Sequence, residues 1–412
     1  MSLSNIKVLD LTRVLAGPYC TQLLADLGAT VTKLEPPLGD GTRKWGPPFL
    51  PGGMSTYFAS VNRNKSSIAV DLKNPLSKPI LEKLVAGADV LVHNFLPRQA
   101  AALGVDYDSV SLLNPRIVHA GITGYGDTGP LKDKPGYDVL CSAMYGLMDV
   151  TGPEGEDCGY KSGVATTDVM AGMVAAQAIT AKLYERDANV GRDANVDTHV
   201  VPFDGQISTS LMETQLSMLS NVASSTLNSR VPRQPRFGNA HESIAPYQTF
   251  SCEDRKSIVV ACGSDRHYRE LAGILGRSSL RNPDFDTNAK RVENRDVLIP
   301  LLEGIFKHKP RDEWIDIFER NDVSFPNGPV RSVAEAFRCP QADHRSSVVE
   351  ITGKEGGTLR AVAHPAKHSG VVSSEKFTHP PDLGEHTRDI LLEEMGFDEE
   401  FVETMIKEKV VF

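Results

Sequence analysis

The chain has 412 residues, which is too long for one ordinary hydrophobic core, so we expect two domains. Hydrophobic residues make up 40% and charged residues 24%, the composition of a globular protein, and no apolar run is long enough to span a membrane. The net charge of −9 argues against nucleic acid as a partner, although a local cationic pocket for an anionic ligand is compatible with it.

The first third of the chain alternates short apolar runs of β character with helical patterns. A strand, a helix and a second strand within about thirty residues form a βαβ unit, which implies a parallel sheet with right-handed crossovers. We expect strands at 6–11, 29–34, 67–71, 89–94 and 116–122, and helices at 19–27 and 75–86. The sequence therefore predicts a doubly wound α/β domain.

The middle of the chain predicts two long helices. Residues 168–185 alternate small and apolar side chains, which is typical of a helix buried on most sides. A strand is expected at 195–201, and a second long helix at 205–227 with Leu211, Met218 and Leu219 on its inner face.

A change of character near residue 228 suggests a domain boundary, because prolines and glycine interrupt a polar stretch there. We expect paired strands at 246–250 and 257–262, followed by helices at 268–275, 295–306, 310–321 and 334–337. The predicted domains are residues 1–227 as the first part of a large domain, 228–337 as a small α+β domain, and 338–412 as a return segment that completes the large domain.

Asp168 is the most informative single residue, because it stands where the long helix after residue 163 begins. The positive field of a helix N-terminus would keep its carboxylate ionised and able to act as a nucleophile. Asp is also among the best N-cap residues, and from the spacing alone a cap is the simpler interpretation.

Several common enzyme classes lack their motifs. The turn at residues 12–18 lies where a doubly wound sheet binds its ligand, and Glu35 ends the second strand, but the glycine fingerprint of a dinucleotide site is missing. P-loop, zincin and nucleophile-elbow motifs are absent too. The six scattered cysteines and the eleven histidines show no ligand spacing, so we expect neither a metal nor a disulfide framework. We expect a reducing, cytoplasmic location, or a mitochondrial one if a presequence has been removed.

Ten short motifs follow one another along nearly the whole chain: VLDLTRVLAGP (8–18), LGA (27–29), KLEP (33–36), NRNKSSI (62–68), DLK (71–73), HNF (93–95), GITGYG (121–126), PGYD (135–138), GNAH (238–241) and LGEHT (383–387). In this order they resemble the class III CoA-transferases, a family that includes formyl-CoA transferase, carnitine CoA-transferase and α-methylacyl-CoA racemase. The resemblance implies a Rossmann-like large domain, a smaller domain, and an interlocked homodimer.

The same resemblance implies that Asp168 is the catalytic nucleophile. It would attack an acyl-CoA thioester to give a mixed anhydride, with CoA as substrate and no tightly bound cofactor or metal. The implied CoA-binding residues are Leu15, Ala16, Val70, Asp71, Lys73, Asn94, Phe95, Tyr137 and Asp138, with Arg98 as a substitute for a basic residue that is missing at Ala102. Without the resemblance, the simpler interpretation of Lys73 is a solvated loop residue, and the sequence fits Phe95 equally well as a core residue.

The acceptor class follows from a longer stretch of the resemblance. Residues 236–248 look most like the succinyl-CoA:dicarboxylate branch, whose acceptors are acids of the glutarate, hydroxymethylglutarate or itaconate type. The unreacted carboxylate needs a cation or several donors, for which Arg43, Arg236 and His241 are candidates, while the loop with Gly238 and Asn239 would shield the reacting centre. Each of them is also an ordinary surface or loop residue on the simpler interpretation.

Two alternatives stay open at this point. An α-methylacyl-CoA racemase ranks below transfer, because Tyr137 stands where that branch needs a histidine for proton transfer. A CoA-binding protein without catalysis is the second alternative.

Overall fold

The computed structural model describes residues 2–189, 203–230, 236–353, 357–369, 371–372 and 376–412. It divides into two compact units: the first comprises Met1–Leu147, Ser162–Asn228 and Gln341–Phe412, and the second comprises Met148–Lys161 and Ser229–Pro340. The sequence-based division placed all of residues 1–227 in the large domain. Met148–Lys161 instead belongs to the second unit, where the guanidinium of Arg236 donates to the carbonyl oxygens of Asp149 and Glu156 at 3.0 and 2.5 Å.

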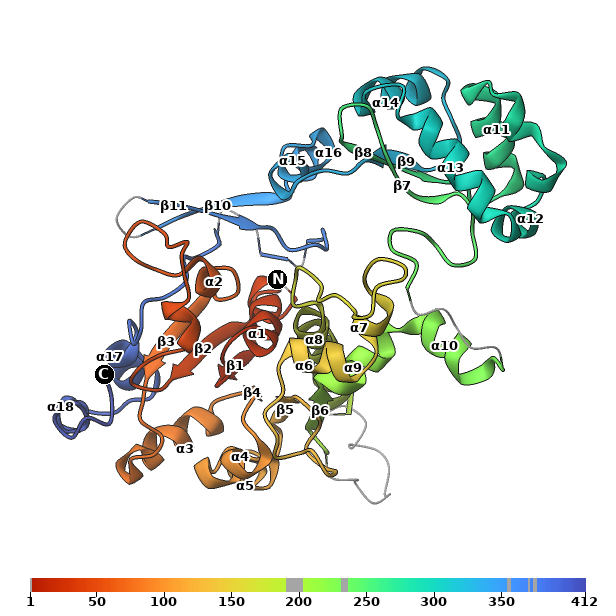
Figure 1. Cartoon of the computed structure of the whole chain (residues 1–412). Coiled ribbons are helices and arrows are strands. Elements are labelled where there is room, and N and C mark those ends of the chain that lie inside the picture. Colours follow the sequence, from red (N-terminus) through yellow and green to blue (C-terminus); the bar gives the residue numbers. More distant parts are fainter. Residues whose placement is uncertain (1, 190–202, 231–235, 354–356, 370, 373–375) are drawn as a thin grey trace. The chain divides into compact units, whose positions relative to one another are not determined.

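The first unit is built on a six-stranded parallel sheet of order β3-β2-β1-β4-β5-β6 (Figure 1). The strands are β1 (Lys7–Asp10), β2 (Thr30–Glu35), β3 (Lys65–Ala69), β4 (Val90–His93), β5 (Val118–Thr123) and β6 (Gln206–Ser210). The prediction of a doubly wound α/β domain is confirmed. The strand order reverses between β1 and β4, and a sheet of this kind binds its ligand at the carboxyl ends of the strands at that point.

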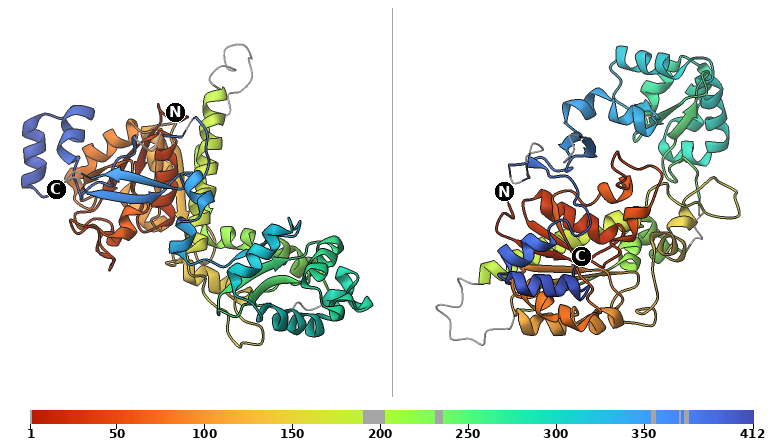
Figure 2. Two further views of the ribbon diagram at one scale, coloured as in Figure 1. Left: turned by 90° about the horizontal axis from the view of Figure 1, so that it is seen from above. Right: turned by 90° about the vertical axis from the view of Figure 1, so that its left-hand side faces the viewer.

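Helices cover both faces of this sheet. The helices of this unit are α1 (Ala16–Asp26), α2 (Thr56–Ala59), α3 (Lys78–Ala86), α4 (Pro97–Leu103), α5 (Tyr107–Leu113), α6 (Asp138–Met144), α8 (Thr166–Asn189), α9 (Leu211–Met218), α10 (Ser220–Asn228), α17 (Thr387–Asp389) and α18 (Glu399–Lys407). One apolar core lies between the sheet, α1 and α8, and the other between the sheet, α3, α5 and α18. The C-terminal segment returns to the sheet, where Val411 forms an antiparallel bridge with Val70 (Figure 2).

Short elements complete the unit. They are the 3-10 helices Gly41–Lys44 and Pro75–Ser77, the π-helix Ile390–Glu394, and the antiparallel pair β10 (Val348–Thr352) and β11 (Thr358–Val362). Two more helices cross the unit boundaries, α7 (Leu147–Val150) and α16 (Pro340–His344).

The predicted helix at 205–227 is wrong. Its first part is strand β6, because Ile207 and Thr209 are β-branched and this segment pairs with β5. The Ser210 hydroxyl accepts the N–H of Glu213 and caps α9. Leu219 separates α9 from α10, whose first residue, Ser220, has a φ of +46°. Leu211 is buried as expected, whereas Met218 and Leu219 are half-buried. The predicted strand at 195–201 lies outside the described residues.

The second unit is the smaller one and mixes a three-stranded antiparallel sheet with helices. Its elements are β7 (Tyr247–Ser251), β8 (Ser257–Ala261), β9 (Asn327–Pro329), α11 (Asp265–Leu275), α12 (Asn288–Glu293), α13 (Arg295–Phe306), α14 (Arg311–Arg320), α15 (Val333–Phe337) and the 3-10 helices Ser278–Arg281 and Pro283–Phe285. Aromatic rings fill its core: the ring of Phe306 lies 4.8 Å from that of Phe250 and 5.2 Å from that of Trp314. Among the described residues of both units, no helix is long and apolar enough to cross a membrane.

Candidate active site

Helix α8 begins at Thr166, so Asp168 lies within its first turn and not at the N-cap position. The capping carboxylate is that of Asp138, at the start of α6. Its Oδ2 accepts the N–H of Thr167 at 2.9 Å and that of Asp168 at 3.4 Å. The N-cap prediction is therefore wrong: a carboxylate from another element takes the free N–H groups of α8, and the Asp168 side chain is left to face a cavity.

The surroundings of Asp168 disfavour the charged form of its carboxyl group. Burial, and after it the carboxylate of Asp138, raise the pKa of Asp168 to about 7. The expectation that the helix N-terminus keeps Asp168 ionised needs correction on this point, since the α8 donors bind Asp138, and the charge of Asp138 repels a second one. Such a carboxyl group changes its protonation state near neutral pH, which is typical of a catalytic carboxylate.

A cavity of about 450 Å³ lies against Asp168. Four of the predicted CoA-binding residues line it as well: Leu15, Ala16, Asn94 and Tyr137. Tyr137 reaches this wall through a close approach of two loops, because a Cβ on Gly124 would lie 2.6 Å from the Cα of Gly136. Only glycine fits there.

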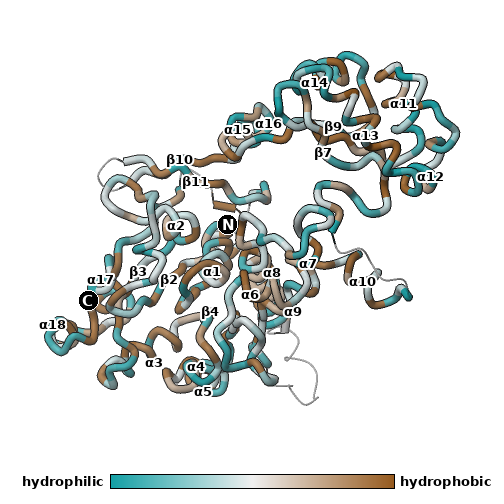
Figure 3. The backbone as a smooth tube through the Cα atoms, in the orientation of Figure 1, coloured by the Kyte–Doolittle hydropathy of each residue, from teal (hydrophilic) through white to brown (hydrophobic). Residues whose placement is uncertain are grey.

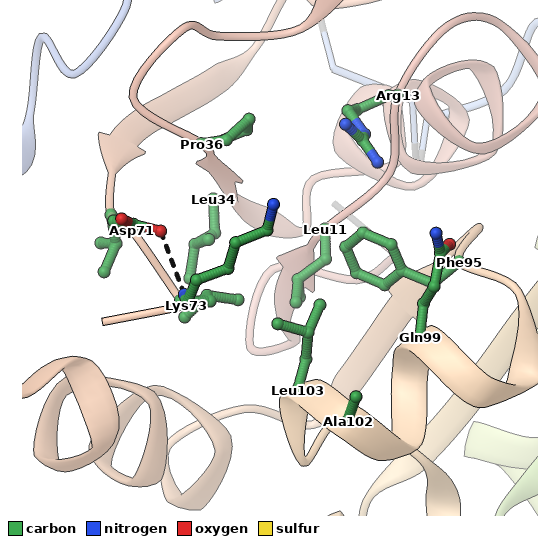
Figure 4. Close-up of a pocket in the computed structure, with 12 residues that line it drawn as sticks. Leu11, Arg13, Leu34, Pro36, Asp71, Lys73, Phe95, Gln99, Ala102 and Leu103 are labelled. Atoms are coloured by element: carbon green, nitrogen blue, oxygen red, sulfur yellow. Dashed lines mark hydrogen bonds between the residues drawn. The ribbon is translucent and has the colours of Figure 1, made fainter. Parts of the chain in front are cut away.

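A larger cavity of about 650 Å³ adjoins the first, since Arg13 and Gln99 line both. Val70, Asp71, Lys73 and Phe95, all predicted to bind CoA, lie in its wall. Its remaining wall is largely apolar, with Leu11, Leu34 and Leu103. Figure 4 shows the charged ends of Arg13 and Lys73 pointing toward one another across the cavity, with the ring of Phe95 nearby. The two cavities therefore form one path at the switch point of the sheet, from a pair of cations to Asp168.

A family model described as CoA-transferase family III matches residues 3–387. The chain belongs to this family. It is 38% identical to the human (Homo sapiens) succinyl-CoA:glutarate CoA-transferase over 411 residues, 99% of this chain and 90% of the relative. It is 35% identical to the succinate–glutarate CoA-transferase of Agrobacterium fabrum, with 95% of each chain covered. Among solved structures, a CAIB/BAIF family protein from Brucella suis matches with a TM-score of 0.82 and 34% identity, over 94% of this chain and 98% of that chain.

The predicted substrate cations of this class III CoA-transferase are engaged elsewhere. Arg43 donates to both carboxylate oxygens of Glu35, at 2.8 and 2.6 Å, and its guanidinium lies 3.8 Å from the ring centroid of Phe58. Arg236 binds the main-chain oxygens that hold Met148–Lys161 in the second unit. Both guanidinium groups therefore bind oxygen atoms of the protein itself.

The other predicted residues divide between the two units. Arg98 is exposed on α4 outside the lining of both cavities, and Asp138 is the buried cap of α8. Gly238, Asn239 and His241 belong to the second unit. There the imidazole of His241 stacks on Tyr247 with centroids 5.2 Å apart, and its Nδ1 accepts the N–H of Ser243. Their part in substrate binding stays a prediction.

Two residues of this transferase that the sequence did not predict as part of the site, Arg13 and Gln99, line both cavities. Arg13 stands in the first βα turn, only two residues before Leu15, and this position was the available signal. Gln99 has no comparable signal, because only the packing of α4 brings it to the cavities. Among the described residues, no group of three His, Cys, Asp or Glu side chains is arranged to hold a metal ion.

Proposed function

We propose that this transferase moves CoA from succinyl-CoA, or a similar acyl-CoA donor, to a small dicarboxylic acid, with Asp168 as the nucleophile. The observation that carries the proposal is the position of Asp168 in the wall of a cavity that adjoins a second, cation-bearing cavity. The acceptor class is of the glutarate, hydroxymethylglutarate or itaconate type. The names of two relatives support it, since both are described as acting between succinate and glutarate.

The larger cavity suits the nucleotide end of CoA. Arg13 and Lys73 have no acidic partner within the described parts of the chain, so their charges are available to phosphate groups. The ring of Phe95 offers a face for adenine, with the guanidinium of Arg13 5.5 Å from its centroid. The pantetheine arm would then pass Gln99 and Leu15 to bring the thioester to Asp168.

The chemistry needs only an ionised carboxylate and exclusion of water. The Asp168 carboxylate attacks the thioester carbonyl, the C–S bond breaks, and CoA leaves as a thiolate while a succinyl–aspartyl anhydride remains. The thiolate attacks the aspartyl carbonyl, which gives an aspartyl–CoA thioester and releases succinate. The acceptor carboxylate and the same thiolate then repeat these two steps in reverse order, so that Asp168 is regenerated. No water is consumed, and the energy of the thioester is kept.

The acceptor's unreacted carboxylate needs donors other than Arg43 and Arg236, since both are bound within the fold. Gly238, Asn239 and His241 stay our candidates for substrate binding. No observation favours the racemase alternative: Tyr137 lines the Asp168 cavity at the position where that reaction needs a histidine.

We also propose a homodimer, as the family resemblance implies. Helix α8 leaves Met170, Met173 and Val174 38–39% exposed, and α6 leaves Met144 54% exposed. Apolar stretches on these helices are visible in Figure 3. A second copy of the chain would cover this apolar surface, and sedimentation velocity at micromolar concentration measures the mass of the assembly.

A trapping experiment tests the proposed reaction. With succinyl-CoA and a panel of dicarboxylic acids, new CoA thioesters should appear, and hydroxylamine should capture an adduct on Asp168 that mass spectrometry locates. Asp168→Ala should lower transfer by about 10⁴-fold while CoA still binds. Asp108→Ala is the matched control, because Asp108 is an exposed acid in the first turn of α5, outside both cavities, and its loss should leave transfer unchanged. The mechanism is refuted if the Asp168→Ala variant stays active and acyl-CoA leaves Asp168 of the wild-type enzyme unmodified.

A further inference from the structure

Four charged side chains are buried beneath the turn between β1 and α1. Asp10, Lys33, Asp40 and Lys65 are each at most 4% exposed. Lys65 Nζ lies 3.0 Å from Asp10 Oδ2, and Lys33 Nζ lies 3.3 Å from Asp40 Oδ2. Buried ion pairs of this kind are weak stabilisers, because desolvation offsets their attraction. Their geometry points to another role.

These four side chains also bind the main chain of the turn. Asp10 accepts the N–H of Thr12 at 2.8 Å, and Lys33 donates to the carbonyl oxygen of Thr12 at 2.7 Å. Lys65 donates to the carbonyl oxygen of Pro18 at 2.9 Å. The Asp40 carboxylate accepts the N–H of Val14, at 3.2 and 3.3 Å from its two oxygens. The turn is therefore held from below at both its ends and at its centre.

The central residue has a backbone conformation that its side chain disfavours. Val14 has a φ of +74°, in the left-handed region where a β-branched residue is a clear outlier. Strain of this kind persists only where the surroundings impose it, and it gathers at functional sites. The Val14 N–H is held by Asp40. The preceding residue is held by Asn94, whose amide accepts the N–H of Arg13 and donates to the carbonyl oxygen of Arg13.

The residues around Val14 reach both cavities. Arg13 lines both of them, and Leu15 and Ala16 line the one that contains Asp168. Helix α8 touches the turn directly, since a Cβ on Gly172, one helical turn after Asp168, would lie 2.6 Å from the carbonyl oxygen of Ala16. A change of φ at Val14 would therefore move Arg13 relative to Asp168.

We propose that Asp40 is a positioning residue of this transferase: it holds Val14 in the left-handed conformation and thereby sets Arg13 and Leu15 for the bound acyl-CoA. This inference rests on the proposed function in placing acyl-CoA in the two cavities. Asp40 itself lines neither cavity. Its effect passes through the backbone of the turn.

A comparison of backgrounds tests this role. Asp40→Asn replaces one accepting oxygen with a donating amide, and it should raise the KM for acyl-CoA about tenfold in the wild-type and Val14→Ala backgrounds. In the Val14→Gly background the increase in KM caused by Asp40→Asn should fall to about twofold or less, because glycine adopts a positive φ without the hydrogen bond to Asp40. Circular dichroism and thermal unfolding check that each variant is folded. The proposal is overturned if Asp40→Asn raises KM equally in all three backgrounds or does not raise it in any of them.

A milder variant covers the case in which Asp40→Asn does not fold. The Thr42 hydroxyl donates to Asp40 Oδ1 at 2.8 Å, so the nearly isosteric Thr42→Val should raise KM about threefold, and Val14→Gly should remove this increase. If Val14→Gly leaves it in place, the proposal fails. Isothermal titration calorimetry with CoA alone measures the Kd for CoA of the wild type and of these variants. It tests the role of the turn even if no dicarboxylic acid proves to be an acceptor, so the two proposals can fail separately.

Discussion

Two aspartates of the first unit, the buried Asp10 and the half-buried Asp168, have opposite acidities. Burial would raise the pKa of Asp10, but Lys65 and Lys33, together with the hydroxyls of Thr12 and Thr21, outweigh it and lower this pKa to about 2. Burial raises the pKa of Asp168 to about 7, and the nearby Asp138 adds to the effect. Desolvation acts in the same direction on both, so the neighbouring charges decide the outcome. The carboxylate beneath the turn has cations beside it, and the proposed nucleophile has a second carboxylate.

The largest expected effect is on stability. Asp10→Asn leaves the ammonium of Lys65 buried without its counter-charge and should lower the free energy of unfolding by about 3 kcal/mol at pH 7, measured by urea denaturation. Because the folded pKa of Asp10 lies below its ordinary value of 3.8, its contribution is complete above about pH 4 and is lost as the pH falls toward 2. The difference in the free energy of unfolding between the variant and the wild type should therefore become smaller as the pH falls from about 4 to 2.

Glu350→Gln is the matched control for this variant. It removes a carboxylate that pairs with Arg360 at 3.0 Å, but both side chains are exposed, so little stability should be lost. If the two substitutions cost the same, the distinction between buried and exposed pairs does not hold in this protein.

A smaller effect concerns the pH dependence of the reaction. Only ionised Asp168 attacks, so kcat/KM for the acyl-CoA donor should rise about tenfold per pH unit below pH 7 and level off above it. Asp138→Asn removes the repelling charge but keeps an oxygen for the N–H of Thr167, and it should lower the midpoint by about one pH unit. CoA release at a series of pH values measures both profiles. An unmoved midpoint would mean that burial alone raises the pKa of Asp168.

The smallest effect is a gain in stability. The folded pKa of Asp168 lies above its ordinary 3.8, so its ionisation disfavours the folded state increasingly between about pH 4 and 7. Asp168→Asn should therefore raise the melting temperature by about 2 °C at pH 8 and leave it unchanged at pH 4. Differential scanning calorimetry distinguishes this from a packing effect, which would raise the melting temperature equally at both pH values.

Most of the sheet was predictable because its parallel strands are buried on both faces and form continuous apolar runs, as at Val90–His93. The predictions failed where two kinds of pattern overlap: Gln206–Ser210 is a short strand directly before a helix, and the apolar residues of both fit one helical period. At the site, nine of the predicted residues line the two cavities. Arg43 is outside the lining of both cavities and pairs with Glu35. The sequence alone does not show this ion pair.

The sequence by itself determined the doubly wound sheet, the long helix after residue 163 and the presence of an aspartate at its start, since these depend on periodicity and on residues close together along the chain. Only the tertiary structure decided that Asp138, and not Asp168, caps α8, that Arg13 lines both cavities, and that Val14 takes a positive φ over Asp40. The reason is physical. Hydrogen bonding, burial and charge repulsion depend on distances in space between segments that lie far apart in the chain.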